Sequence, residues 1–174
     1  MTTWFTSDLH FGHNNIITYC KRPYADKNEM DEGLITNWNK KIQPTDSVYV
    51  LGDFSFHKEN KTREIILRLN GIKHMILGNH DRGYGKDVNL WYEYFVSVED
   101  YARVTVDGHK FVLCHFPFAS WERGYVNLHG HTHGMRTPYF AQHDVGVDYN
   151  NMVPITSHEA YARAMSHQTK TEYA

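Results

Sequence analysis

Three short apolar segments of the chain each end in polar residues, and this repeated pattern limits the possible fold most strongly. The segments are TTWFTSDLH at 2–10, SVYVLGD at 47–53 and KHMILGNHD at 73–81. A short run of β-branched and apolar residues bounded by turn residues is typical of a buried strand. The residues that follow the three apolar runs include Asp8, His10, Asp53, Asn79, His80 and Asp81. The pattern predicts three buried strands that deliver polar side chains at their carboxyl ends.

Helical patterns separate these strands. A helix is expected from about Asp26, because Asp26 and Glu29 have the spacing of a capping box. Apolar residues then recur every four positions, as on one helix face, at Met30, Leu34, Trp38 and Ile42. The segment 61–71 predicts a second helix, with Gly71 just past its end. This βαβαβ order predicts an α/β sheet with parallel strands that is covered on both faces.

The second half of the chain predicts shorter strands. Residues 102–117 have the pattern of a hairpin with Asp107 and Gly108 at its turn. The segments 125–133 and 143–149 predict further strands.

Thr156 and Glu159 have the capping-box spacing for a last helix that ends near Met165. No internal repeat, linker or low-complexity segment interrupts the pattern. We therefore expect one domain over residues 1–174, with a polar tail from about 167.

The composition argues against several classes of protein. The chain has 174 residues, of which 41% are hydrophobic, and a formal net charge of −2. It therefore lacks the basic excess typical of proteins that bind long nucleic acids. Its two cysteines, Cys20 and Cys114, form neither a CxxC zinc motif nor a disulfide framework. The first residues lack the pattern of a signal peptide, and no apolar run approaches the roughly 18 residues of a membrane span. We expect a soluble cytoplasmic protein that does not bind membranes.

The polar residues after the predicted strands should converge, because ligands of open α/β sheets bind outside the carboxyl ends of the strands. Seven of these residues could bind metal: Asp8, His10, Asp53, Asn79, His115, His131 and His133. Carboxylates, an amide oxygen and imidazoles together suit manganese, iron or zinc better than calcium. Seven ligands exceed what one tetrahedral ion uses. They suit two ions about 3.5–4 Å apart that share a bridging carboxylate.

Five short motifs, taken together, resemble the signature of a known family. They are DLH at 8–10, GD at 52–53, GNHD at 78–81, H at 115 and GHTH at 130–133. In this order, each beside a predicted strand, they resemble the signature blocks of the calcineurin-like metallophosphoesterases. The segment SDLHFGHNNIITYCKRPY also resembles small stand-alone phosphoesterases of bacteria and their phages. The resemblance implies an α/β fold with two mixed β-sheets packed face to face and flanked by helices.

The resemblance also implies a role for each matching residue. One ion would be bound by Asp8, His10 and His133, a second by Asn79, His115 and His131, and both by Asp53. His80 would act as a general acid or stabilise charge at the phosphate, and Asp81 would orient His80. The implied reaction is hydrolysis of a phosphoester by in-line attack of a hydroxide that bridges two divalent ions. We expect Mn²⁺, with Fe, Zn, Ni or Co as alternatives.

Other residues near these motifs have two interpretations. Four of them could bind substrate or be solvated loop residues: His13, Asn14, His57 and Arg82. Arg82 and Arg123 could grip a second phosphate, because arginine makes bidentate contacts with phosphate, or they could be ordinary surface residues. His129 lies outside the family pattern and could likewise be a functional residue or a solvated loop residue, and surface positions are expected for His109, His143, His158 and His167. The aromatic residues between Tyr84 and Phe95 could be core residues, or some could form a lip on which a nucleobase stacks.

The hypothesis that we favour is a phosphodiesterase acting on small phosphate esters or nucleotides, including cyclic ones. A nuclease of the same superfamily would need a basic groove for the phosphate backbone, and the chain has only scattered basic residues. A phosphomonoesterase stays open. A catalytically silent scaffold that binds a protein partner is less favoured, because every ligand position is filled. The sequence leaves the oligomeric state open.

Overall fold

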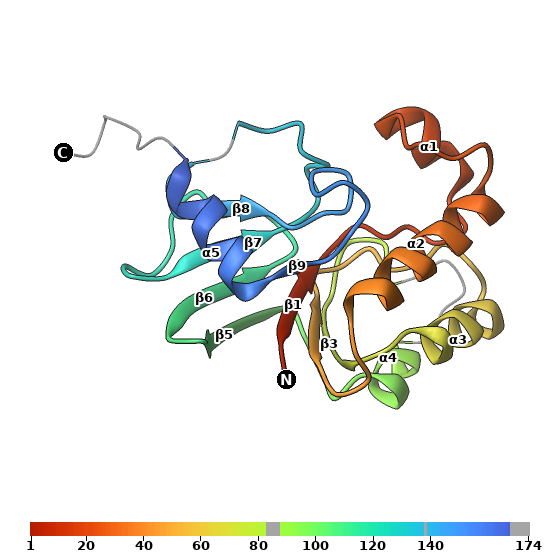
Figure 1. Ribbon diagram of the computed structural model, residues 1–174, viewed down its shortest axis with the longest axis horizontal. Coiled ribbons are helices and arrows are strands. Elements are labelled where there is room, and N and C mark those ends of the chain that lie inside the picture. Colours follow the sequence, from red (N-terminus) through yellow and green to blue (C-terminus); the bar gives the residue numbers. More distant parts are fainter. Residues whose placement is uncertain (83–87, 138, 168–174) are drawn as a thin grey trace.

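The computed structural model describes residues 1–82, 88–137 and 139–167, and its strands form two sheets (Figure 1). The first sheet has five strands in the order β4-β3-β2-β1-β9: β1 (Thr3–Thr6), β2 (Ser47–Val50), β3 (Ile72–Ile76), β4 (Ser97–Glu99) and β9 (Ile155–Thr156). The second has four strands in the order β5-β6-β7-β8: β5 (Tyr101–Val106), β6 (His109–Cys114), β7 (Val126–His129) and β8 (Gln142–Asp144).

Both sheets are mixed. In the first, β1 pairs parallel with β2, β2 with β3 and β3 with β4, whereas β9 is antiparallel to β1. In the second, β5 and β6 form the predicted antiparallel hairpin, and β6, β7 and β8 run parallel. In the two-residue turn between β5 and β6, Asp107 and Gly108 both have positive φ, which is the conformation that matches the twist of a hairpin. The predicted fold class is confirmed.

Buried side chains cover both faces of the first sheet. Successive side chains of a strand point to opposite faces, so Trp4 of β1 and Met75 of β3 belong to one core cluster and Phe5 and Ile76 to another. The helices are α1 (Asn14–Cys20), α2 (Lys27–Lys41), α3 (Glu59–Arg68), α4 (Asn89–Tyr94) and α5 (Ser157–Ser166). The first cluster lies between this sheet and α2, α3 and α4, which cover its outer face (Figure 1).

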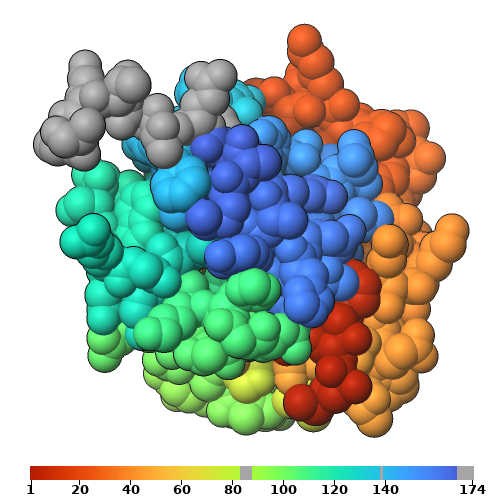
Figure 2. All heavy atoms as spheres, turned by 60° about the vertical axis from the view of Figure 1, so that its left-hand side comes forward, coloured from red at the N-terminus to blue at the C-terminus, as the bar shows by residue number. Residues whose placement is uncertain are grey.

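The second core cluster lies between the two sheets. It joins Phe5 and Leu51 of the first sheet region to Phe111 and Leu128 of the second sheet, and the rings of Phe5 and Phe111 are 5.2 Å apart. Helix α5 contacts β1 and β9 of one sheet and β7 and β8 of the other. Figure 2 shows α5 (dark blue) at the surface, above the β5–β6 hairpin (green) and beside the N-terminal strand (red).

The predicted helix starts are present. The Asp26 carboxylate accepts hydrogen bonds from the backbone N–H groups of Asn28 and Glu29, although the Glu29 carboxylate accepts from Ala25 rather than from Asp26. Thr156 and Glu159 form a complete capping box at α5. These caps satisfy backbone N–H groups that have no partner within the first helical turn.

One predicted helix end was wrong. Helix α3 ends at Arg68, and the residue that caps it, Leu69, is extended rather than left-handed. Leu69 is also buried, so burial of an apolar side chain ends the helix before Gly71 is reached. Gly71 has φ +92° but directly precedes β3. Gly71 therefore belongs to the loop that leads into β3.

Four elements had no signal in the sequence pattern: α1, α4, β4 and β9. They have seven, six, three and two residues, which is too short for apolar periodicity to show. Helix α4 shows which residues of the aromatic segment belong to the core. Trp91 and Phe95 are buried in the first core cluster, while Tyr92 is exposed. Tyr84 and the tail after 167 lie outside the described residues. None of the helices described is long and apolar enough to cross a membrane.

Candidate metal centre

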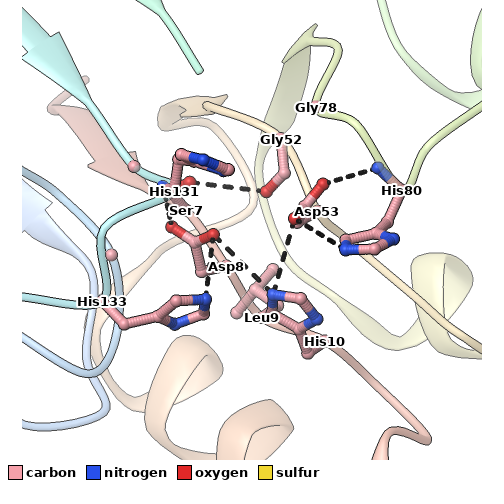
Figure 3. Close-up of polar contacts among 12 residues, drawn as sticks. Ser7, Asp8, Leu9, His10, Gly52, Asp53, Gly78, His80, His131 and His133 are labelled. Carbon is pink, nitrogen blue, oxygen red and sulfur yellow. Dashed lines mark hydrogen bonds and ion pairs between the residues drawn. The ribbon is translucent and has the colours of Figure 1, made fainter. Parts of the chain in front are cut away.

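The polar residues that follow the strands meet at one edge of the sheets (Figure 3). Asp8, Asp53 and His80 follow β1, β2 and β3, whose parallel pairing places their carboxyl ends side by side. The loops after β6 and β7 bring His115 and the HGHTHG segment, residues 129–134, to the same edge. The expected convergence of strand ends therefore occurs across both sheets.

Close contact between the loops depends on Gly52. A Cβ added to this residue would lie 2.5 Å from Nδ1 of His115 and 2.7 Å from Cα of Gly78. Its φ of +89° is also a conformation that favours glycine. The loops after β2, β3 and β6 can therefore approach closely enough to share one centre.

The backbone is strained at five of the predicted ligands. Positive φ values between +49° and +67° occur at Asp8, His10, Asp53, His131 and His133. A non-glycine residue in this region costs on the order of 1–3 kcal/mol, and such residues cluster at functional sites. Five strained residues at one edge indicate that the fold holds these side chains for chemistry rather than for stability.

Asp8, His10 and His133 form the first group of converging ligand atoms. Oδ1 of Asp8 lies 3.7 Å from Nε2 of His10 and 3.9 Å from Nε2 of His133. These distances exceed those of hydrogen bonds. They fit two ligands of one ion, which at metal–ligand distances of about 2.1 Å lie at most about 4.2 Å apart. Among the described residues, Asp8 Oδ1 and both ring nitrogens of His10 are buried without a hydrogen-bond partner, and a cation would satisfy Oδ1 and Nε2.

Asp53 and His115, together with Asp8, form a second group. Oδ2 of Asp53 lies 3.5 Å from Nε2 of His115 and 3.6 Å from Nε2 of His10. Oδ1 of Asn79 lies 3.0 Å from Nε2 of His115. Asp53 thus faces one histidine of each predicted ion site. The two groups of ligand atoms are adjacent rather than separate.

In their neutral form, two of the histidines would present an unprotonated nitrogen to the centre. Nδ1 of His115 lies 2.7 Å from the carbonyl oxygen of Leu51, and Nδ1 of His133 lies 2.7 Å from Oδ2 of Asp148. Because these oxygens only accept, Nδ1 carries the hydrogen, and Nε2 of the neutral ring is left as an acceptor facing the carboxylates. The carboxylate oxygens and these Nε2 atoms would all be acceptors, and a divalent cation between them would bind both kinds of atom. The donor set therefore fits such ions.

His131 occupies a different position. Its backbone N–H donates to Oδ2 of Asp8 over 3.0 Å, and its ring lies 5.2 Å from that of His115. Its ring nitrogens belong to neither group of converging ligand atoms among the described residues. Its role as a ligand stays a prediction.

Arg22 and Asp148 support the centre, and the sequence did not single them out. Nε and Nη2 of Arg22 each lie 2.8 Å from the Asp148 carboxylate, and the two side chains are 0% and 3% exposed. Arg22 also donates to the backbone carbonyls of Asp8 and Leu9. Burial raises the pKa of Asp148, but hydrogen bonds from His133 and Arg22 outweigh burial and hold the pKa below its usual value. A buried charge pair therefore fixes the loop after β1 and the ring of His133 together.

Asp144 holds the HGHTHG segment in place. Its carboxylate accepts hydrogen bonds from the hydroxyl of Thr132 and from the backbone N–H groups of Gly134 and Gly146. His129, the first residue of the segment, is buried, and its Nδ1 lies 2.8 Å from the Gly130 carbonyl oxygen. His129 is therefore a buried residue next to the site rather than a solvated one.

His80 faces the centre, whereas Asp81 binds backbone. The His80 backbone N–H donates to Oδ1 of Asp53 over 2.9 Å, and its ring Nε2 lies 3.9 Å from Oδ2 of the same carboxylate. Asp81 is fully buried and accepts from the backbone N–H groups of Asp53, Phe54 and Gly78. Asp81 therefore ties the loop of Asp53 to the GNHD turn, which is a wider task than the predicted orientation of His80.

The four predicted substrate residues are placed differently. His13 lies at the site, where its ring stacks on Phe56 at 4.1 Å; burial lowers the pKa of His13 to about 4. The side chain of Asn14 accepts from the backbone N–H of Lys27. Nε2 of His57 lies 2.6 Å from Oδ2 of Asp31, and Arg82 pairs with Asp100 over 2.5 Å at an exposed position. Asn14, His57 and Arg82 thus have protein partners, and His13 is the one of the four that stacks beside the ligands.

One histidine prediction was wrong. His143 was expected at the surface but is 1% exposed, with Nε2 3.3 Å from Oδ1 of Asn150 and Nδ1 3.3 Å from Nε2 of His167. All three residues of β8 are buried, because α5 packs against this strand. His158 and Arg123 are exposed, as expected of surface residues.

Comparison with known proteins identifies the family of the chain. The model of the calcineurin-like phosphoesterase family matches residues 1–171. An uncharacterised protein of Methanocaldococcus jannaschii is 38% identical over 75% of this chain and 68% of its own length. The gene 66 protein of Mycobacterium phage L5 is 32% identical over 84% of this chain and 86% of its own. The crystal structure of a protein of unknown function from Aquifex aeolicus has a TM-score of 0.73 and 28% identity, and covers 91% of this chain and 96% of its own. The chain belongs to the calcineurin-like phosphoesterase family.

Proposed function

We propose that the protein is a phosphodiesterase that uses two divalent ions to hydrolyse small phosphate diesters, among them nucleotide esters. Membership of the family supports hydrolysis of phosphoesters with the help of metal ions. The net charge of −2 supports a small substrate over a long nucleic acid. A cytoplasmic location is part of the same proposal and rests on the composition, including two cysteines that are both free.

The position of Asp53 carries the proposal. One oxygen of this carboxylate, Oδ2, lies 3.6 Å from Nε2 of His10 and 3.5 Å from Nε2 of His115. The two histidines come from different loops and belong to different predicted ion sites. A carboxylate between two such ligands is the feature that two ions about 3.5–4 Å apart require.

This geometry supports most of the residues proposed to hold the ions, and the resemblance of the sequence motifs adds His131. Asp8, His10 and His133 would hold one ion, Asn79, His115 and His131 the other, and Asp53 both. Mn²⁺ is the ion that we propose for activity, because nitrogen and oxygen ligands without thiolate suit it. When bound, the pair of ions would lower the pKa of a water molecule and neutralise charge on a phosphate.

The side chains around the centre would then act on the substrate. The side chain of His80 is 30% exposed, and its ring lies beside Asp53. The ring can therefore reach an ester oxygen of a bound phosphate. Burial lowers the pKa of His80. The neutral ring can still donate one N–H to the leaving oxygen, and the negative charge of a phosphate would favour its protonated form. His80 would therefore stabilise the leaving alkoxide and supply its proton.

The experiment compares a diester with a monoester. The protein is stripped with a chelator and reloaded with Mn²⁺, and hydrolysis of bis-p-nitrophenyl phosphate is compared with that of p-nitrophenyl phosphate. Two variants run alongside, Asp53→Ala and His80→Asn, with His109→Asn as a matched control, because His109 stacks on Tyr161 outside the predicted ligand set. We expect faster cleavage of the diester by the wild type and the control, and loss of cleavage in the two site variants.

Other results would contradict parts of this proposal. Preference for the monoester would indicate a phosphomonoesterase. Absence of hydrolysis with Mn²⁺, Fe²⁺, Zn²⁺, Ni²⁺ and Co²⁺ would argue against a general esterase and favour a scaffold without activity.

A further inference from the structure

Phe116 is an exposed aromatic residue at the candidate centre. It follows His115 at the end of β6, and its exposed fraction is 45%. Its ring centroid lies 4.7 Å from that of His131 and 5.1 Å from that of His115, with interplanar angles of 63° and 77°. His131 is itself exposed. Phe116 therefore stands on the open side of the centre, beside the residues predicted to hold the second ion.

A second phenylalanine lies beside the other ligands, but its environment differs. Phe56 is half-buried, and its ring stacks with that of His13 at 4.1 Å and that of His10 at 5.2 Å. It also contacts His80, with ring centroids 4.7 Å apart. Phe56 thus packs the imidazoles on the side where His80 would meet the leaving group. Phe116 lies among different histidines and keeps almost half of its surface open.

The aromatic segment near residue 90 offers no replacement for Phe116. Trp91 and Phe95 are buried in the core between the first sheet and its helices, and Trp91 donates its indole N–H to the carbonyl oxygen of Asp81. Tyr94 packs beside the guanidinium of Arg63. Phe116 is therefore an exposed planar ring in contact with two residues predicted to hold the second ion, His115 and His131.

We propose that Phe116 binds a planar aromatic group on the ester that the substrate keeps after cleavage, such as a nucleobase or an aryl ring. The inference rests on the proposed function, because it needs a phosphate held at the ligands. A group joined to that phosphate on the side away from His80 would lie next to His131 and Phe116. Stacking there would bury apolar surface of Phe116 that is now exposed to water. The site would then prefer diesters with an aromatic retained group over alkyl diesters.

Three substrates with the same leaving group test this preference. They are thymidine 5′-(p-nitrophenyl phosphate), phenyl p-nitrophenyl phosphate and methyl p-nitrophenyl phosphate, and each releases p-nitrophenolate. The first two carry a ring on the retained side, and the third does not. The variants are Phe116→Ala, Phe116→Leu and Phe116→Trp. Phe140→Ala is the matched control, because Phe140 is also an exposed phenylalanine, at 38%, and lines a cavity with Tyr161 and Met165 instead.

We expect Phe116→Ala and Phe116→Leu to lower kcat/KM for the two aromatic substrates by roughly 5- to 150-fold relative to the methyl ester, the range that stacking of one base supplies. The loss should appear mainly in KM. Phe116→Trp should restore the preference, and Phe140→Ala should not alter it. Loss of activity on the nucleoside ester alone would assign the partner as a nucleobase, and equal loss on both would assign it as any planar ring.

An unchanged ratio between aromatic and methyl esters in Phe116→Ala would overturn the proposal, and so would an equal fall for all three substrates. Binding of thymidine 5′-phosphate and methyl phosphate to the Mn²⁺-loaded protein, measured by calorimetry, separates this proposal from the proposed function. Weaker binding of thymidine 5′-phosphate alone in Phe116→Ala supports the stacking role even if no ester is hydrolysed. Equal binding by the wild type and the variant overturns it.

Discussion

Replacing Asp148 by Asn should weaken metal binding without removing any predicted ligand. Oδ2 of Asp148 lies 2.7 Å from Nδ1 of His133 and 2.8 Å from Nη2 of Arg22, and Oδ1 lies 2.8 Å from Nε of Arg22. All three nitrogens are donors. An Asn side chain has the same shape, but it offers one acceptor oxygen, and its NH₂ group would face a donor. With NH₂ at the Oδ2 position, both His133 Nδ1 and Arg22 Nη2 lose their acceptor, whereas with NH₂ at the Oδ1 position Arg22 Nε loses its acceptor.

The magnitude follows from the two functions of this carboxylate. A carboxylate that orients a metal-binding histidine typically contributes about 10- to 100-fold in metal affinity, which is about 1.4–2.8 kcal/mol. The Arg22–Asp148 pair is also buried, and breaking a buried pair costs about 3–5 kcal/mol of stability. Because Asn keeps one acceptor, this cost is an upper bound. We expect the protein to fold and to bind the ion at His133 more weakly.

The assay is a titration of chelator-stripped protein with Mn²⁺ by calorimetry, with urea unfolding measured on the same samples. The matched control is Asp46→Asn. Asp46 accepts from the backbone N–H groups of Thr2 and Gln43 and precedes β2, at the opposite end of the strand from Asp53. The control should lose stability but keep its Mn²⁺ affinity. If Asp148→Asn also kept wild-type affinity for both ions, Asp148 would be a residue of the fold alone.

Three further variants test other parts of the structure. Burial lowers the folded-state pKa of His143 to about 4. The unfolded chain therefore binds a proton more readily, and stability is lost as pH falls from about 6.5 towards 4. Over that window the free energy of unfolding in urea should fall by about 3 kcal/mol more in the wild type than in His143→Gln. Asp81→Asn removes one of two acceptors for three buried backbone N–H groups, and a loss of about 1–3 kcal/mol is expected in urea unfolding, with no loss contradicting its role. A Cβ on Gly78 would collide with the Asp53 carboxylate, so Gly78→Ala should lose Mn²⁺ affinity, whereas Gly108→Ala, where a Cβ meets nothing within 4 Å, should keep it.

The sequence predicts the strands and helices whose formation does not depend on contacts with distant residues. Buried strands of a parallel sheet are apolar throughout and end where polar residues begin, so SVYVLGD marks both β2 and the position of Asp53. Helix α2 has four turns, which is long enough for its apolar face to show as a repeat of Met30, Leu34 and Trp38. Short elements such as α4 form because Leu90 and Trp91 reach a core that already exists, and local sequence carries little signal of that.

The supporting residues of the site depend on contacts between distant positions. Arg22 and Asp148 are separated by 126 positions, and neither lies in a motif that would pair it with the other. His143 looks like a surface residue in the sequence, because its burial comes from α5, which lies later in the chain. Candidate ligands could be named from the sequence because each lies at or near the end of a predicted strand. The residues that orient them could not.

The state without metal should be measurably less stable than the loaded state. Asp8 and Asp53 each converge with His115 at the centre, and Oδ1 of Asp8 and Nε2 of His10 are buried without hydrogen-bond partners among the described residues. Burial raises the pKa of Asp8, but the imidazoles of His10, His115 and His133 outweigh burial and lower it below its usual range, so the carboxylate stays charged. A cation at this point pairs with that charge and with the unpaired atoms. Ions that bind only the folded state stabilise it by about 2.7 kcal/mol at 100 times their Kd. Thermal unfolding with Mn²⁺ and with chelator should show this difference in the wild type and little of it in Asp53→Ala. An equal gain in both would place the stabilising ion elsewhere on the protein.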